Sequence, residues 1–400
     1  MNPPHPFISP STKRLSSHAI SSNNAEAIIV VAQSGRQLAA AARAVGLVPL
    51  VIDRFGDVDT CAAAQAVEVV ATRSDGALCE GEVEVQVARW RARWPRAPVV
   101  WGGGLEAQVE LLTALGQDGA LLGSDLAGLR ILQSPALLAR ELAALQVPMP
   151  AVAREAHAEH GGWLRKRCGA AGGWHVQPYT PGSGLAADEY LQRAVPGRSY
   201  SYTFVATNDS ILGLGFNQMI NLQPSAVMPF RYGGAVAGAA LPGSVQSACA
   251  DFAQRMAQRF GWRGLCGFDF IFDGRDLAVV DLNPRPTATF GLAFTAASTF
   301  AAHLAACRHQ RLPLLVAHPA VCGHLVCYAV DAIQIPNSLD SLNWPPWVSD
   351  RPRPGSVIPA GAPLCSINAA SGSVLDTTAL LSARLAACWQ WVAAATSQSQ

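Results

Sequence analysis

The sequence predicts an α/β protein, and three observations lead to this fold class. Two uninterrupted apolar runs, at 27–32 and 47–53, flank an alanine-rich segment at 36–45. Fully apolar strands around a helix are typical of a parallel sheet that is covered on both faces. Farther along the chain, short segments alternate apolar and polar residues, which indicates the half-buried strands of a second, α+β part.

The N-terminal elements follow from this pattern. Residues 1–25 are rich in Ser, Pro and Asn and lack periodic apolar residues, so we expect a disordered tail. The β-α-β unit is followed by a strand at 97–104 that ends in three glycines. Because ligands of such sheets bind at the carboxyl ends of the strands, this glycine turn is a candidate rim of a site. We expect a first domain over 26–125.

The middle of the chain, 126–315, is predicted to form one α+β module. We expect helices at 134–147, 245–260 and 287–302, and strands at 162–168, 174–179, 190–197, 199–206, 210–218, 268–272 and 277–282. A glycine-rich turn at 169–173 separates the first two of these strands. Short strands with glycine turns and a last helix at 378–395 predict a small β-rich C-terminal domain over 316–400.

Composition and net charge limit the classes of function that this chain can have. Half of the 400 residues are hydrophobic, 14% are charged, and the net charge is +1. No run of Lys and Arg could neutralise a phosphate backbone, so nucleic acid is excluded as a partner and small molecules are expected. The longest uncharged stretch is shorter than the roughly 20 apolar residues of a membrane helix. Ten scattered cysteines and an N-terminus without an apolar signal region predict a cytoplasmic protein. A monomer and a homodimer both stay open.

One lysine stands out from the composition. Of the 29 basic residues only Lys13 and Lys166 are lysines, and Lys166 lies in the predicted strand before the glycine-rich turn. An ammonium group is a compact charge that suits a single phosphate oxygen. We therefore expect an exposed Lys166 that binds a ligand.

The segment 267–291 carries the most specific chemistry. Two strands joined by a short Asp/Gly turn place Asp269 on the first strand and Asp281 and Asn283 on the second. Residues two apart on a strand point to the same face, so these three side chains can share one ion. Two carboxylates and an amide oxygen suit Mg²⁺. Arg285 follows on the same face, where a guanidinium would meet a transferred phosphoryl group or a developing oxyanion.

This segment resembles the metal-binding end of the ATP-grasp superfamily, whose members carry an acidic residue, any residue and then Asn-Pro-Arg. The resemblance covers roughly residues 27–310 and implies an ATP-grasp fold, with the first domain as a pre-ATP-grasp domain and with ATP and Mg²⁺ as cofactors. It implies that the metal is held by Asp269, Asp281 and Asn283, and that the catalytic residue is Arg285. It also implies phosphate binding by Lys166, Gly169, Gly172 and Gly173, and adenine binding by the backbone of Gln192, Arg193, Ala194 and Val195.

Three stretches narrow the resemblance to a branch of the superfamily. YLQRAVPGRSYSYTFVA at 190–206, GFNQ at 215–218 and the segment 344–367 are similar to tyramine-glutamate ligases and their relatives in one-carbon coenzyme synthesis of the methanofuran and tetrahydromethanopterin type. The resemblance implies a carbon-nitrogen ligase for a small carboxylate and a small amine. The carboxylate attacks the γ-phosphate of ATP to give an acyl phosphate, and the amine then displaces phosphate to form an amide.

The chain departs from the superfamily pattern at three places. ILQSP at 131–135 lacks the first phosphate-contacting lysine, Asp281 stands where Glu is usual, and no acidic residue near Ser199 is present to hold the ribose. A nucleotide-binding protein without turnover is therefore one alternative.

Two further alternatives use other residues. In an NAD-dependent oxidoreductase, Gly35 would be the glycine of the phosphate turn and Asp53 the ribose acid, although the full G-x-G-x-x-G pattern is absent. A zinc site would use Cys322, His324 and Cys327, with His303, Cys307 and His309 upstream as further ligands. The spacing of the first three is not that of a standard zinc knuckle.

Overall fold

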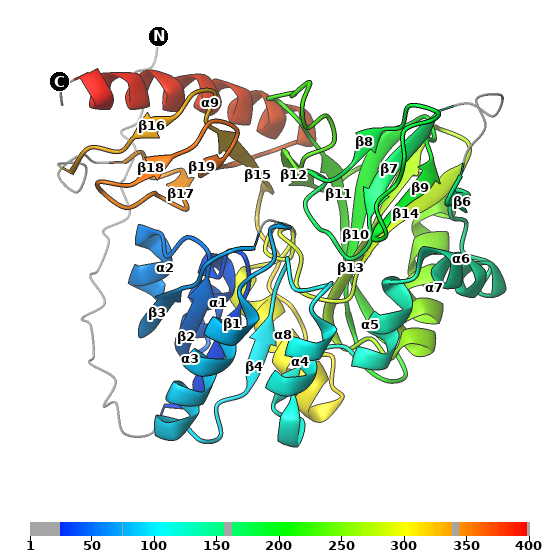
Figure 1. The fold of residues 1–400 in the computed structure, drawn as a ribbon, viewed down its shortest axis with the longest axis horizontal. Helices are drawn as coiled ribbons and strands as arrows, with labels where there is room; N and C mark the ends of the chain where they lie inside the picture. Colours follow the sequence, from blue (N-terminus) through cyan, green and yellow to red (C-terminus); the bar gives the residue numbers. More distant parts are fainter. Residues whose placement is uncertain (1–24, 74, 156–161, 338–343, 398–400) are drawn as a thin grey trace, which may run out of the picture.

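The computed structural model describes residues 25–73, 75–155, 162–337 and 344–397. The described chain forms a parallel sheet, a small antiparallel sheet and a large antiparallel sheet, with helices packed on them (Figure 1). A wide central cleft is lined by residues of both antiparallel sheets and by the segments that follow β1, β2 and β4 of the parallel sheet. The tail predicted at 1–25 lies outside the described residues, apart from residue 25.

The N-terminal sheet is parallel, which confirms the prediction. Its strand order is β3-β2-β1-β4-β5, and the strands are β1 (Ala27–Val31), β2 (Val48–Asp53), β3 (Ala66–Val69), β4 (Val99–Trp101) and β5 (Leu121–Leu122). Ile28 of β1 packs in one core with α1 (Arg36–Ala44) and α8 (Ala296–His309). Ile29 packs in another core with α3 (Glu80–Arg93) and α4 (Val109–Leu115). Neighbouring residues of the strand thus serve opposite faces, which is why its sequence is apolar throughout.

Short elements complete this region and connect it to the module. They are α2 (Val58–Ala63), the 3₁₀ helix η1 (Gln117–Gly119), α5 (Leu126–Leu132) and α6 (Pro135–Ala144). A proline at the first position of α6 suits a helix start, because that position needs no backbone N–H. A small antiparallel sheet of order β6-β9-β7-β8 follows, with β6 (Val152–Ala153), β7 (Trp163–Arg167), β8 (Gln177–Pro178) and β9 (Glu189–Arg193). The strand predicted at 174–179 is reduced to the two residues of β8.

The large sheet is antiparallel and has the order β14-β13-β10-β11-β12-β15-β19-β17. Its strands are β10 (Arg198–Ala206), β11 (Ile211–Met219), β12 (Gly234–Ala237), β13 (Gly264–Phe272), β14 (Leu277–Asn283), β15 (Val321–Tyr328), β17 (Val348–Ser349) and β19 (Pro363–Ser371). Helix α7 (Gly243–Phe260) packs on it and ends at Gly261, whose left-handed conformation (φ 63°) suits a glycine cap. A pair of short strands, β16 (Ile333–Gln334) and β18 (Val357–Ile358), and helix α9 (Val374–Ser397) complete the fold.

The C-terminal strands continue this large sheet. Strand β15 pairs with β12, with Ala235 opposite His324, and β19 pairs with β15. The predicted boundary at 315/316 therefore falls between two parts of one sheet. Alternating strand patterns predict strands but do not say which neighbours they pair with, so this continuity was not visible in the sequence.

The buried helix predicted at 287–302 begins only at Ala296. Thr295 caps its N-terminus, with its side-chain oxygen accepting a hydrogen bond from the Ser298 backbone N–H at 3.3 Å. Residues 287–292 form turns instead, and they line the central cleft. The absence of charge in this stretch thus reflects burial rather than helix.

The two faces of the large sheet around β10, β11, β13 and β14 carry different kinds of side chain. The aromatic face, defined here as Tyr200, Tyr202, Phe204, Phe268 and Phe270, is buried in one core with α7. The polar face, defined as Ser201, Thr203, Asn217, Asp269 and Asp281, points the other way; Ser201, Asp269 and Asp281 of this face line the cleft. The alternation of side chains along each strand produces both faces from one sequence.

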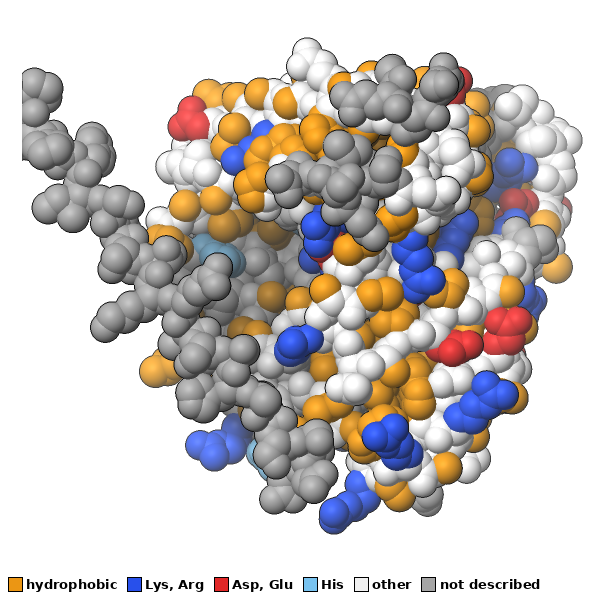
Figure 2. All heavy atoms as spheres, turned by 90° about the vertical axis from the view of Figure 1, so that its left-hand side faces the viewer, with side chains coloured by type: hydrophobic (Ala, Val, Ile, Leu, Met, Phe, Trp, Pro, Cys, Tyr) orange, Lys and Arg blue, Asp and Glu red, His pale blue; other side chains and the backbone are white. Residues whose placement is uncertain are grey.

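The surface shows no basic stripe on the face displayed in Figure 2, where Lys and Arg side chains are scattered among hydrophobic and neutral ones. None of the described helices combines the length and apolar character that a membrane crossing needs.

Candidate nucleotide and metal site

The two candidate metal carboxylates lie side by side on the hairpin of β13 and β14. Asp269 is directly opposite Asp281 in the antiparallel register, and a bulge follows Asp269. Asn283 is two residues along β14 from Asp281 and pairs opposite Gly267. The structure therefore places the three predicted side chains on one face of the sheet, at the floor of the cleft.

Several charged side chains lie close together around the two carboxylates. Burial and the neighbouring Asp281 raise the pKa of Asp269 to about 7, against the opposing effect of Arg285 and Lys166. Asp281 lines the cleft, and its side chain is exposed there. The surrounding protein shields its carboxylate from bulk water, and this desolvation is the main cause that raises the pKa of Asp281, while Lys166 and Arg285 act in the opposite direction. Two carboxylates that resist ionisation together form a site that a divalent cation would stabilise.

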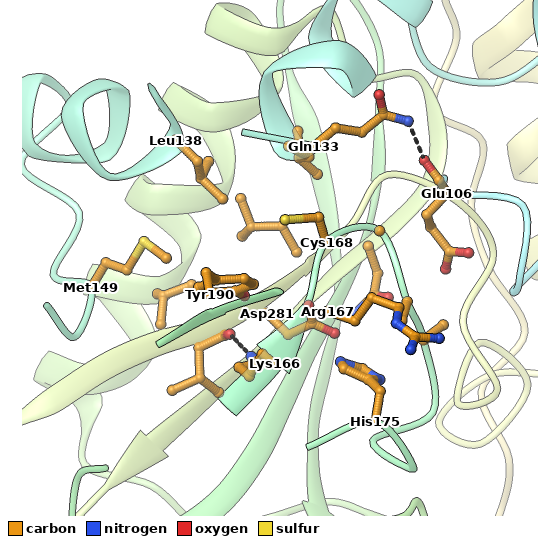
Figure 3. Close-up of a pocket in the computed structure, with 18 of the residues that line it drawn as sticks. Glu106, Gln133, Leu138, Met149, Lys166, Arg167, Cys168, His175, Tyr190 and Asp281 are labelled. Carbon is orange, nitrogen blue, oxygen red and sulfur yellow. Dashed lines mark hydrogen bonds between the residues drawn. The ribbon is translucent and has the colours of Figure 1, made fainter. Parts of the chain in front are cut away.

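Lys166 is buried, in contrast to the exposed position expected from the sequence. It lies on β7, which packs over β14, so that its Nζ donates hydrogen bonds to Val280 O at 3.0 Å and to Gln192 Oε1 at 3.2 Å. Only 7% of the residue is exposed. Burial lowers the pKa of Lys166, and the nearby Asp281 and Asp269 oppose this shift. Figure 3 shows Lys166, Asp281 and His175 around the same cavity.

The glycine-rich turn follows β7 and borders the same cavity. Gly169, Gly172 and Gly173 all have positive φ, at 67°, 75° and 71°, a conformation that residues with a side chain rarely adopt. A Cβ at Gly173 would lie 2.0 Å from Phe230 O. The backbone requires glycine at these positions, which explains the composition of the turn.

The predicted adenine segment, Gln192 to Val195, lines the cleft at the end of β9. The backbone N–H groups of Arg193 and Ala194 already donate to Ala151 O at 2.8 Å and to Gly162 O at 3.0 Å. These two donors are therefore unavailable to an adenine ring while the strands stay paired. The remaining polar groups of the segment include the Gln192 amide, which is buried beside Lys166.

Arg285 is held by a residue that the sequence reasoning missed. Its Nε donates to Glu106 Oε1 at 2.7 Å, and its Nη2 donates to Asn283 Oδ1 at 2.8 Å. Both Arg285 and Glu106 are buried. The Asn283 oxygen accepts one hydrogen bond and keeps a second lone pair, so Asp269, Asp281 and Asn283 all stay predicted ligands of a metal. Glu106 is the second residue after the glycine turn predicted as a site rim, and that position was the available signal.

The glycine turn itself reaches the site. A Cβ at Gly103 would lie 3.3 Å from the Arg285 guanidinium carbon, and the Gly104 N–H donates to Glu106 Oε2 at 2.7 Å. The carboxyl end of β4 thus packs against the end of β14, and the segment after the parallel sheet's β4 forms one wall of the site.

A family model described as an ATP-grasp domain matches residues 135–289, which contain Lys166, the glycine turn and both carboxylates. The fold is that of the ATP-grasp superfamily.

Solved structures of this fold superpose over most of the chain. An ADP complex of N5-carboxyaminoimidazole ribonucleotide synthetase has a TM-score of 0.66 at 14% identity and covers 91% of this chain and 97% of its own. The same enzyme from Thermotoga maritima has a TM-score of 0.64 at 14% identity, with 90% and 98% covered. An L-amino acid ligase from Bacillus licheniformis has a TM-score of 0.67 at 11% identity, with 90% and 96% covered. No curated protein matches the sequence.

The cleft contains polar atoms that suit a bound nucleotide. Gln192 Nε2 and His175 Nδ1 are buried and have no hydrogen-bond partner among the described residues. Both residues border the cleft. A buried polar atom without a partner is costly, so a polar ligand there would be stabilising. Together with the two carboxylates, these atoms make the residues present fit ATP and Mg²⁺.

The place of the missing first lysine is occupied by polar and neutral groups. Gln133 lines the cavity, and its Nε2 donates to Glu106 O at 3.2 Å. Arg130 points elsewhere and pairs with Glu110 at 2.7 Å on the surface. Lys166 and Arg167 are the lysine and arginine that line this cavity among the described residues.

The structure does not support the two alternatives outside this superfamily. Asp53 is fully buried, and its carboxylate accepts backbone hydrogen bonds from Gly35, Phe55 and Gly56, so it cannot hold a ribose. His324 lies on one face of β15 and Cys327 on the other, because side chains alternate along a strand. The proposed zinc set with Cys322 is therefore not formed.

Proposed function

We propose that this protein is an ATP-dependent ligase that joins a carboxylate to an amine. The observation that carries the proposal is the meeting of Lys166 with Asp269 and Asp281, from strands far apart in the sequence, on the floor of one cleft. A buried lysine beside two carboxylates suits a nucleotide phosphate with a divalent cation. The fold shared with an L-amino acid ligase supports the same reaction class.

In the proposed reaction, a substrate carboxylate oxygen attacks the γ-phosphorus of ATP, and ADP leaves. The amine nitrogen then attacks the acyl carbon of the acyl phosphate, inorganic phosphate leaves, and the nitrogen releases a proton as the amide forms. Mg²⁺ held by Asp269, Asp281 and Asn283 would neutralise charge on the phosphate oxygens. Lys166 binds a phosphate oxygen, and the guanidinium of Arg285 stabilises the charge that develops in the transition state.

Phosphate release measures this activity. The purified chain is given Mg-ATP with a panel of carboxylates and amines, beginning with glutamate plus tyramine or tyrosine, and phosphate is quantified for each pair and for each compound alone. We expect phosphate release that requires one acid and one amine together, and we expect mass spectrometry to detect the amide product. The tyramine-glutamate branch and one-carbon coenzyme synthesis stay predictions that this panel tests.

A second candidate function is nucleotide binding without turnover, and the neutral Gln133 in the segment that lacks the first phosphate-contacting lysine favours it. If the chain binds Mg-ATP but releases no phosphate with any pair of a broad panel, the ligase proposal is wrong and this second function replaces it. Release that depends on an acid but not on an amine would also overturn the ligase proposal, because no amide is then formed.

A further inference from the structure

Three cysteines meet in the core formed by β15, β19 and α9. Cys327 of β15 and Cys365 of β19 are directly opposite each other in the antiparallel pair, and Cys388 of α9 lies over them. Their exposed fractions are 0%, 2% and 1%. The Sγ atoms of Cys365 and Cys388 are 3.7 Å apart, and all three sulfurs lie within 4.8 Å of one another. Figure 1 shows α9 running along the strands that carry the other two.

The spacing of the sulfurs matches metal coordination. A metal–sulfur bond is about 2.3 Å long, so two thiolates on one ion are roughly 3.8 to 4.0 Å apart. The three thiols therefore need little movement to bind one ion between them. Soft thiolate ligands select soft metal ions over hard ones, so this site has a preference opposite to that of Asp269 and Asp281.

The number of available ligands indicates which soft metal ion fits this site. Structural zinc sites are almost always four-coordinate. Among the described residues, no further His, Cys, Asp or Glu joins the three cysteines. The neighbours in this core are apolar, and include Leu325, Ile367, Leu381, Leu385 and Val392. A site with three sulfurs and dry walls suits an ion that accepts three thiolates without water.

We propose that Cys327, Cys365 and Cys388 form a three-coordinate site for a soft monovalent ion, Cu(I). Each thiol that binds the ion gives up its proton to solvent, and no electron is transferred. Cys365 also borders the central cleft, which provides a route for the ion to enter. A bound ion would tie α9 to both strands at the point where the sheet and the helix meet.

Competition for Cu(I) tests this site in the full-length chain. The protein is reduced, freed of metal without oxygen, and titrated with Cu(I) against a coloured Cu(I) chelator. We expect the wild type to retain one ion per chain at chelator concentrations that remove Cu(I) from Cys388→Ala. The matched control is Cys249→Ala, which removes a buried cysteine of α7 outside the cluster and should retain the ion like the wild type.

X-ray absorption of the Cu(I)-loaded wild type provides a second measurement that needs no variant. We expect three sulfur neighbours at about 2.3 Å. Equal retention by the wild type and Cys388→Ala would overturn the proposal, because the ion would then sit on other cysteines. An X-ray absorption spectrum with only two sulfur neighbours would also overturn the proposal. So would four-coordinate binding of Zn(II) at these cysteines in a matching titration against a chelator. Circular dichroism shows whether Cys388→Ala is folded, and Cys327→Ser takes its place if it is not.

Discussion

Successive residues of strands β10 and β13 point to opposite faces of the sheet, and the two faces have different roles. The aromatic face is sealed by α7, and ring pairs such as Tyr202 with Phe216, 4.7 Å apart between centroids, fill its core. On the polar face, Asp269 and Asp281 stand close together at the cleft. The comparison teaches that the groups with most effect on folding and the groups with most effect on chemistry can be one residue apart.

The largest expected effect lies on the aromatic face. Phe268 is fully buried among Tyr202, Phe204 and Phe270. Phe268→Ala leaves a cavity that the sheet cannot close, so we expect a loss of about 3–5 kcal/mol in the free energy of unfolding. Denaturant unfolding measures it. A loss below about 1 kcal/mol would mean that this face does not hold the sheet and α7 together.

The next effect lies at the site. Arg285→Ala removes a guanidinium that meets more charge in the transition state than in the bound substrates, so kcat should fall about 10²- to 10³-fold with a much smaller change in ATP affinity. Steady-state phosphate release and ATP titration measure the two quantities. Arg275→Ala, in the exposed turn of the same hairpin, is the control and should change neither. Equal losses in kcat and affinity would assign Arg285 to binding.

Ligand binding at the polar face should stabilise the folded protein. Mg-ATP or Mg-ADP at about 100 times its dissociation constant should add roughly 2.7 kcal/mol to the free energy of unfolding, by mass action. A thermal-shift series with ATP, ADP and NAD, each with and without Mg²⁺, measures this. NAD should give no shift, since Asp53 is buried and already hydrogen-bonded. A shift with NAD alone would contradict the site described above.

Lys166 shares one property with each face, because it is buried like the aromatic residues and charged like the carboxylates. Lys166→Met keeps most of its length and loses the ammonium, so nucleotide affinity should fall by about 1.5–3 kcal/mol, the range for a hydrogen bond to a charged group. Calorimetric titration measures the affinity. Arg165→Met, the preceding residue on the other face of β7, should leave it unchanged. An unchanged affinity in Lys166→Met would make this lysine a structural residue.

The smallest effect on stability is expected at the carboxylates. Because the pKa of Asp269 is raised in the folded protein, its ionisation lowers the free energy of unfolding as the pH rises from about 4 to 7. Asp269→Asn removes this penalty, so the metal-free variant should be at least as stable as the wild type at pH 8. Denaturant unfolding at pH 4 and pH 8 checks the sign. A variant clearly less stable than the wild type at pH 8 would show that the carboxylate supports the fold.

The sequence was informative wherever a local pattern carries the structure. The apolar runs of β1 and β2 and the spacing of Asp269, Asp281 and Asn283 predicted the parallel sheet and the shared face. Helix α3 was missed because its residues are largely polar, with a narrow buried stripe that includes Val83 and Val87.

Contacts between segments that are distant in the sequence could not be predicted. Glu106 and Arg285 are separated by 179 positions, and no spacing rule connects them. The burial of Lys166 depends on β14 packing under β7, which is a tertiary event. The cysteines of the C-terminal half have no motif spacing, because two strands and a helix bring them together.

The continuation of the large sheet through β15 and β19 affects how the chain can be divided. A fragment ending at residue 315 would uncover the outer side of β12, where Gly234, Ala235 and Val236 now pair with β15. Unpaired backbone groups along a flat strand are a template for joining another copy of the chain. Such a fragment should aggregate rather than behave as an isolated ATP-grasp module, so the C-terminal strands protect the module against self-association.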